Sequence, residues 1–146
     1  MDDQIQSNVF ENTEIKFKIH HVGCAVKNIS EALKYYVGIL GFKVVEDAFE
    51  VPSQKVKVCF IDVGNGTLIE LVEGISEDSP VKKILEQPGG GVYHACYEVE
   101  DLEKAVSYLC NNKFLKYRRS EIRNERYRAL YMVTPDDQLL ELIQKL

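Results

Sequence analysis

The sequence lacks any apolar run that approaches the ~20 residues needed to span a bilayer. Residues 1–15 carry acidic side chains where a secretory signal would need positive charge, and no long apolar stretch follows them. These two absences argue against a membrane protein and against a secreted one. We therefore expect a cytoplasmic chain with no membrane partner.

The sequence also has no excess of basic residues, and its formal net charge is −5. Proteins that bind nucleic acids by default need a basic face to neutralise phosphates, so we expect no nucleic-acid partner. The four cysteines show no C-x-x-C pairing, and their spacing does not support a zinc cluster. We expect them to be reduced thiols, mostly packed as small apolar groups.

The 146 residues suffice for one domain with a substantial hydrophobic core. We expect a mobile arm over residues 1–15 and a single domain over residues 16–146. Turn residues and hydrophobic periodicity predict a strand and then a helix opened by Ser30, followed by three strands. A short helix begins near Pro80, and the strand–helix–strands order then returns. The strands are expected at 17–27, 42–51, 55–63, 67–73, 92–100, 114–119, 127–133 and 139–144, and the second long helix at 101–112.

This order suggests an internal repeat, and an alignment of the two halves of the sequence supports it. The stretch "HVGCAVKNISEALKYY" from His21 aligns with "HACYEVEDLEKAVSYL" from His94, and "TLIELVE" aligns with "QLLELIQ". The alignment pairs His21 with His94 and Glu70 with Glu141. The sequence therefore predicts an α+β fold of duplicated βαβββ modules, one over about 17–75 and the other over about 90–146, which form a curved, half-barrel mixed sheet.

The repeat gives a common interpretation to four polar residues on apolar strands. A single strand histidine is usually a structural residue, and a single strand glutamate usually faces water or pairs with a lysine. Four such residues related by one internal symmetry favour convergence at the pseudo-twofold axis. Two imidazoles and two carboxylates suit a borderline divalent ion such as Co, Ni, Zn, Mn or Fe. His20, which precedes His21, is expected to face the opposite side of the strand. The predicted metal ligands are His21, Glu70, His94 and Glu141.

The motifs "HHVGCAVKNISEALKYY", "IELVEGISEDSPVKKILE", "YHACYEVEDLEKAV" and "LLELIQ" resemble those of the vicinal oxygen chelate (glyoxalase/bleomycin resistance/dioxygenase) superfamily. Within it, methylmalonyl-CoA epimerases are most similar, although Thr134-Pro135 stands where they usually carry His-Pro. The resemblance implies a divalent metal between two half-barrels, held by the same four residues. It also implies a small-molecule substrate, an acyl-CoA or a thiol adduct, and a homodimer.

Such a site favours removal of a proton next to a carbonyl, and we expect a metal-dependent isomerase or epimerase. Glu141 is the expected catalytic base, with Glu70 as its symmetric partner. One alternative is a glyoxalase-I-type (lactoylglutathione) lyase, which can share this ligand set. Another is a non-catalytic small-molecule or antibiotic-binding protein of the same fold.

One basic segment, "YRRSEIRNERYR", has two interpretations. Charged runs usually form a solvated face, which is the simpler interpretation. The alternative is a clamp for CoA phosphates or for the carboxylate of glutathione. The arginines concerned are Arg118, Arg119, Arg123, Arg126 and Arg128.

Overall fold

A computed structural model describes residues 15–88, 90–117 and 121–146. Most of the expected N-terminal arm, together with Arg118 and Arg119, lies outside these ranges. No helix within them is long and apolar enough to cross a membrane. The strands are β1 (Lys18–Ala25), β2 (Lys43–Val51), β3 (Val56–Asp62), β4 (Leu68–Gly74), β5 (Val92–Glu98), β6 (Leu115–Lys116), β7 (Ile122–Arg123), β8 (Tyr127–Val133) and β9 (Leu139–Lys145). The helices are α2 (Ile29–Tyr36), α3 (Pro80–Leu85), α4 (Leu102–Asn111) and the short 3₁₀ helix η1 (Pro52–Gln54).

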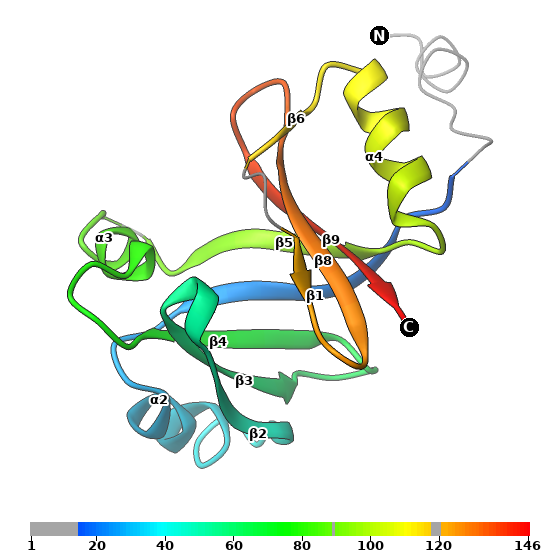
Figure 1. Ribbon diagram of the computed structural model, residues 1–146. Helices are drawn as coiled ribbons and strands as arrows, with labels where there is room; N and C mark the ends of the chain where they lie inside the picture. The colour runs from blue at the N-terminus through cyan, green and yellow to red at the C-terminus, as the bar shows by residue number, and fades with distance from the viewer. Residues whose placement is uncertain (1–14, 89, 118–120) are drawn as a thin grey trace, which may run out of the picture.

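In the described part of the chain, all nine strands belong to one mixed sheet. Its order is β2-β3-β4-β1-β5-β9-β8-β6, and β7 also pairs with β8. The first strand of each module lies parallel to the last strand of the same module, β1 beside β4 and β5 beside β9. The two first strands, β1 and β5, pair antiparallel and join the modules. This arrangement confirms the predicted fold class (Figure 1).

The duplication is visible in backbone hydrogen bonds at equivalent positions. Val26 N–H donates to the Val72 carbonyl and Val99 N–H to the Ile143 carbonyl, both at 2.9 Å. These bonds close the same corner of each module, where the first strand passes into the helix. The repeat predicted from sequence letters is therefore also a repeat of local structure.

Each long helix begins at a capping residue that the repeat pairs. Asn28 Oδ1 accepts from Glu31 N–H at 2.9 Å, and Asp101 Oδ1 accepts from Lys104 N–H at 3.0 Å. The expectation that Ser30 opens the first helix is wrong. The helix begins one residue after Asn28, because Asn caps at least as well as Ser and has the extended backbone that a cap requires.

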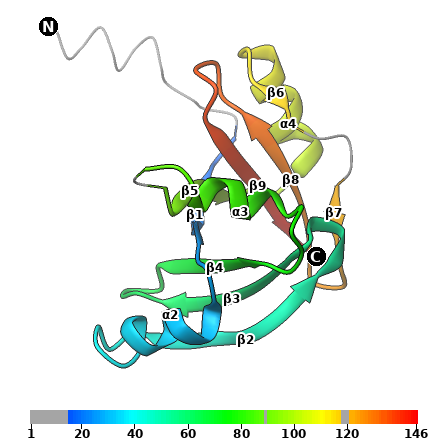
Figure 2. The same cartoon turned by 90° about the vertical axis from the view of Figure 1, so that its left-hand side faces the viewer.

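The two long helices, α2 and α4, cover the outer face of the sheet, whereas the short helix α3 packs at the edge of the inner face. Under α2, the side chains of Cys59, Ile61 and Leu71 form one apolar cluster, while Met132, Leu140 and Leu142 lie under α4. Alternation along the strands sends the intervening residues to the inner face. Figure 2 shows the two helices at the outer sides of the sheet, so the inner face is the place for a site.

The second module departs from the first in its second strand. A strand is expected over residues 114–119, but the structure has only β6 there, and β7 follows after residues outside the described ranges. In the first module the equivalent strand, β2, is nine residues long. The wall of the second module next to β8 is thus built from two short pairings instead of one long one.

Candidate metal centre

The four predicted ligands lie in two equivalent rows across the sheet. In one row Glu70 on β4 faces Gly23 on β1, and Gly23 faces His94 on β5. In the other row Glu141 on β9 faces Cys96 on β5, and Cys96 faces His21 on β1. Each row therefore carries a carboxylate and an imidazole on either side of a central residue.

The rows bring the four side chains to a common point on the inner face. His21 Nε2 lies 3.2 Å from His94 Nε2. Glu141 Oε1 lies 3.1 Å from His21 Nε2 and 3.5 Å from His94 Nε2. Glu70 Oε1 lies 3.7 Å from each of the same two nitrogens. All four residues predicted from the sequence thus lie together on the inner face. Glu70 is slightly more distant from the two imidazoles than Glu141 is.

Burial and ring packing hold the imidazoles in place. His21 is 1% exposed and His94 3% exposed. The Phe60 ring packs edge-on against His21 with ring centroids 5.3 Å apart, and the Tyr131 ring packs in the same way against His94 at 5.4 Å. Phe60 and Tyr131 occupy matching positions next to Glu70 and Glu141 in the neighbouring strands. Each imidazole is therefore held by an aromatic ring from its own module.

The charges of this cluster are strongly coupled. Burial raises the pKa of Glu70 to about 7, and the neighbouring Glu141 charge also raises it. Burial would raise the pKa of Glu141 as well, but its contacts with His21 and His94 outweigh burial and lower that pKa to about 2. Burial opposes the charged form of His21, yet Glu141 and Glu70 raise its pKa. The cluster therefore stabilises positive charge between the two carboxylates.

A divalent cation fits this donor set. Ligand atoms around one ion at about 2.0–2.2 Å lie roughly 3.0–3.5 Å from one another. The contacts among His21, His94 and Glu141 have this spacing, and these three residues form a group that could hold a metal ion. Among the described residues, the buried Glu141 Oε1 has no hydrogen-bond donor. An ion would satisfy this oxygen, since a buried carboxylate oxygen without a partner is costly.

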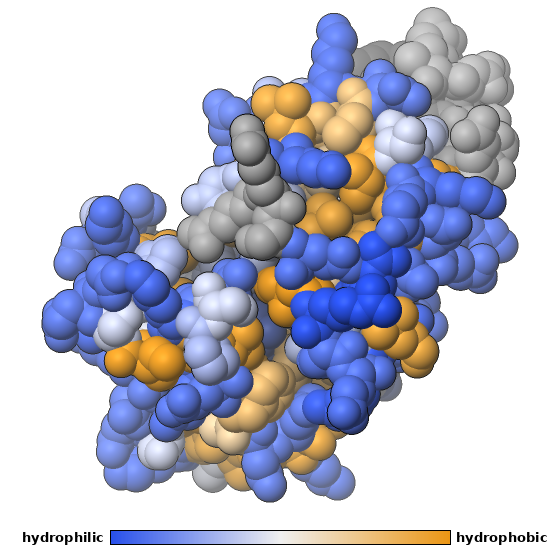
Figure 3. All heavy atoms as spheres, viewed as in Figure 1, coloured by the Kyte–Doolittle hydropathy of each residue, from blue (hydrophilic) through white to orange (hydrophobic). Residues whose placement is uncertain are grey.

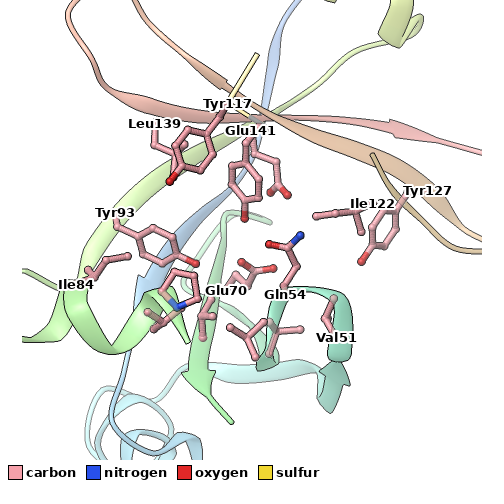
Figure 4. Close-up of a pocket in the computed structure, with 16 residues that line it drawn as sticks. Val51, Gln54, Glu70, Ile84, Tyr93, Tyr117, Ile122, Tyr127, Leu139 and Glu141 are labelled. Carbon is pink, nitrogen blue, oxygen red and sulfur yellow. The ribbon is translucent and has the colours of Figure 1, made fainter. Parts of the chain in front are cut away.

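Two openings lead to the cluster, and both carboxylates line both of them. The first is bounded by residues of both modules, including Gln54, Tyr93, Tyr117 and Tyr127. Figure 4 shows Glu70, Glu141 and Gln54 directing their polar ends toward the middle of this cavity. In Figure 3, apolar side chains are visible in the middle of the face that Figure 1 presents, between the hydrophilic side chains of the two modules. A ligand in the first cavity would meet an apolar wall and a few polar groups.

The second opening lies on the other side of the cluster. It is lined by His20, Phe60, Arg126 and Lys145 among others. His20 therefore does not face away from His21, and that expectation is wrong. A shift in the β1–β5 register between Ile19 and His21 turns His20 to the same side of the sheet. Burial lowers the pKa of His20, and the adjacent His21 lowers it further.

The basic segment does not act as one unit in the structure. Arg128 pairs with Glu103 on α4 and with Glu121, away from the cluster. Arg126 pairs with Glu46 on β2 at the second opening, so it bridges the two modules at the surface. Of the described arginines, Arg126 is the one that lines an opening to the cluster.

Sequence reasoning missed several residues of the site. Gly23 has no side chain, and a Cβ there would lie 1.9 Å from His94 Cε1. A glycine inside a predicted strand is a signal of close approach, so this contact was open to prediction. The Gln54 side chain comes from a turn after a proline, and no pattern in the sequence places it in the cavity.

Comparison with known proteins agrees with this geometry. Residues 20–126 match the Glyoxalase/Bleomycin resistance protein/Dioxygenase superfamily. The chain belongs to this superfamily, as its duplicated fold and paired His and Glu residues indicate.

Several proteins that this chain is similar to are methylmalonyl-CoA epimerases. The mitochondrial methylmalonyl-CoA epimerase of Homo sapiens is 36% identical over 66% of this chain and 54% of its own. The ethylmalonyl-CoA/methylmalonyl-CoA epimerase of Cereibacter sphaeroides is 41% identical over 63% of this chain and 68% of its own. The crystal structure of methylmalonyl-CoA epimerase from Mycobacterium tuberculosis superposes with a TM-score of 0.77 at 24% identity, covering 88% of both chains. The match thus spans about half the length of the human relative.

Proposed function

We propose that this chain is a divalent-metal-dependent epimerase that removes and returns a proton next to the thioester carbonyl of an acyl-CoA such as methylmalonyl-CoA. The observation that carries the proposal is the convergence of two imidazoles and two carboxylates at the junction of the modules, within 3.1–3.7 Å of one another where they are paired. The similarity to acyl-CoA epimerases supports the substrate class.

In this proposal His21, His94, Glu141 and Glu70 hold the ion. When bound, a divalent ion supplies Lewis-acid stabilisation for negative charge that develops on the carbonyl oxygens of a substrate. The site is buried on the strand side and open toward the cavities, so a substrate approaches the carboxylates from the cavity. Two imidazole nitrogens and two carboxylate oxygens suit Co, Ni, Zn or Mn.

Glu141 is the proposed base. Its carboxylate is held as an anion by the two imidazoles, and it lines the cavity in which an acidic C–H would lie. Glu70 occupies the symmetric position from the other module and lines the same cavity. Two carboxylates in one cavity suit inversion at carbon, because one group must take the proton and another must return it.

The remaining cavity residues orient the substrate. Burial raises the pKa of both Tyr93 and Tyr131 well above the usual value, so both phenols stay neutral and can donate hydrogen bonds. Together with the Gln54 amide, they can bind the carboxylate of a malonyl-type acyl group. Val56, Val58 and Val72 provide an apolar wall for an alkyl branch.

The proposal predicts hydrogen exchange at the carbon next to the thioester. Protein loaded with Co²⁺, Ni²⁺, Zn²⁺ or Mn²⁺ in D₂O is expected to exchange the C2 proton of methylmalonyl-CoA, followed by ¹H NMR. Glu141→Gln is expected to lower the exchange rate by roughly 10²-fold or more, since a positioned base contributes that much. Chelated protein should show no exchange.

A parallel sample tests the glyoxalase alternative. It contains the methylglyoxal–glutathione hemithioacetal under the same conditions. Conversion of this adduct without exchange of methylmalonyl-CoA would replace the epimerase proposal with a lyase. Metal binding without turnover of either compound would leave a binding protein of this fold.

A further inference from the structure

His20 is an extra residue in the central strand pairing. Ile19 and His21 on β1 face Tyr97 and Cys96, which are consecutive on β5, so no residue of β5 lies opposite His20. Such a bulge re-aims a side chain and is common next to functional sites. Here it brings His20 Nδ1 to 2.8 Å from His21 Nδ1, although neighbours on a regular strand point to opposite faces. The contact is therefore a product of the bulge.

The second module repeats the bulge with a different side chain. Gly23 and Cys24 face His94 and Val92, so Tyr93 is the extra residue on β5. Its ring packs edge-on against His94 with centroids 4.5 Å apart. Within the described residues, however, His94 Nδ1 has no hydrogen-bond partner. The two imidazoles thus have a bulge residue at equivalent positions, but of the two only His21 has a nitrogen atom beside its Nδ1.

The proton positions follow from the direction that each nitrogen faces. His21 Nε2 points at the cluster, where Glu141 Oε1 and His94 Nε2 lie 3.1 and 3.2 Å away. A histidine that binds a cation through Nε2 carries its proton on Nδ1. That proton has His20 Nδ1 as its acceptor at 2.8 Å, provided that His20 carries its own proton on Nε2.

We propose that His20 is a positioning residue for the metal centre, which accepts a hydrogen bond from His21 Nδ1 and so presents His21 Nε2 to the ion. This inference rests on the metal centre of the proposed function. His94 is held in another way, by its close packing on Gly23 and between the rings of Tyr93 and Tyr131. The two halves of the centre thus use different supports, a hydrogen bond in the first module and ring packing in the second.

The test uses the affinity for Co²⁺, measured by competition with a chromophoric chelator. His20→Phe keeps a ring of similar size against Phe60 but removes the acceptor. His20→Asn keeps an acceptor near the position of Nδ1. Loss of such an outer partner weakens metal binding by roughly 10- to 100-fold. We expect this loss for His20→Phe, and an affinity within about threefold of the wild type for His20→Asn, because it retains the acceptor.

Tyr93→Phe is the matched control in the second module. It occupies the equivalent bulge and does not supply a partner to His94 Nδ1, so its Co²⁺ affinity should equal that of the wild type. Thermal unfolding of the metal-free variants shows whether each is folded. His20→Ala, with the same loss expected, serves if His20→Phe does not fold.

Three outcomes would overturn the inference. One is wild-type affinity in both His20→Phe and His20→Ala. Another is an equal loss in His20→Asn and His20→Phe, which would assign the effect to packing. The third is an intense thiolate-to-cobalt band in the near ultraviolet, which would place the ion at His20, His21 and Cys96, a second group with suitable spacing. Failure of the wild type to bind Co²⁺ at all would instead overturn the metal centre itself, and this inference with it.

Discussion

Gly23 shows how one residue without a side chain can decide the geometry of a site. It lies between Glu70 and His94 in the row of paired strands, and the His94 ring occupies the space above its Cα. In the other row the equivalent position is Cys96, which is fully buried. Because Gly23 has no side chain, the first module leaves room for the His94 ring of the second module.

Gly23→Ala is expected to displace His94 and to weaken Co²⁺ binding by at least roughly 100-fold, the upper range for loss of ligand support. The reason is a Cβ 1.9 Å from His94 Cε1, a distance that atoms cannot keep. Gly91→Ala is the control, because its Cβ would meet only Cys24 Sγ, at an ordinary 3.9 Å. Chelator competition measures both variants, and an unchanged affinity for Gly23→Ala would contradict the geometry described for His94.

Individual residues also show what the sequence could and could not predict. The pairing of His21 with His94 and of Glu70 with Glu141 follows from an internal alignment, and the structure brings all four together. Their roles as metal ligands stay predictions. The direction of His20 was predicted wrongly because a bulge depends on the pairing of two strands, and the sequence of one strand does not reveal it.

At the scale of elements, the two modules use the same hydrogen bonds to start their helices. Asn28 and Asp101 cap the helices, and a side-chain oxygen from the last strand of each module adds a second bond. Glu73 Oε1 accepts from Ile29 N–H at 2.7 Å, and Gln144 Oε1 accepts from Leu102 N–H at 2.8 Å. Each helix is thereby joined to the strand that carries a glutamate of the cluster.

Removal of either cap should destabilise the protein. Asn28→Ala and Asp101→Ala are each expected to lower the free energy of unfolding by about 1 kcal/mol, because the N–H groups of Glu31 and Lys104 would lose their acceptors. Urea unfolding measures the change. Ser30→Ala, an exposed position inside the first helix, is the control and should leave stability unchanged or slightly higher. Equal losses in all three variants would contradict the assigned caps.

Element order and faces were largely predictable, whereas one element end and one strand were not. Period-two alternation puts Glu70 on the same face of β4 as Leu68 and Val72, and the structure packs the neighbouring Leu71 under α2 on the other face. The start of the first helix shifted from Ser30 to Asn28, since both residue types cap and local sequence does not choose between them. The second strand of the second module is shorter than expected: β6 pairs only with Met132 and Val133 of β8, and β7 pairs with Arg128 and Ala129 further along the same edge, while β9 pairs along the opposite edge.

At the scale of the whole molecule, the cluster is the point where the modules meet inside the sheet. Each of the four central strands, β4, β1, β5 and β9, supplies one of the four side chains. The pair formed by Arg126 and Glu46 links the modules again at the surface, where it is well exposed and adds little stability. An ion at the cluster would therefore link the halves in addition to the antiparallel pairing of β1 with β5. The expected homodimer stays a prediction.

The metal content of the purified protein tests this account most directly. After loading with Co²⁺, Ni²⁺, Zn²⁺ or Mn²⁺ and removal of free ions, elemental analysis is expected to find a single divalent ion per chain. His94→Ala should retain little or none, because it removes one of the two proposed nitrogen ligands, which lies 3.5 Å from Glu141 Oε1. Wild-type protein with no ion above the buffer level under all four metals would contradict the account, and so would a His94→Ala variant that retains its full complement.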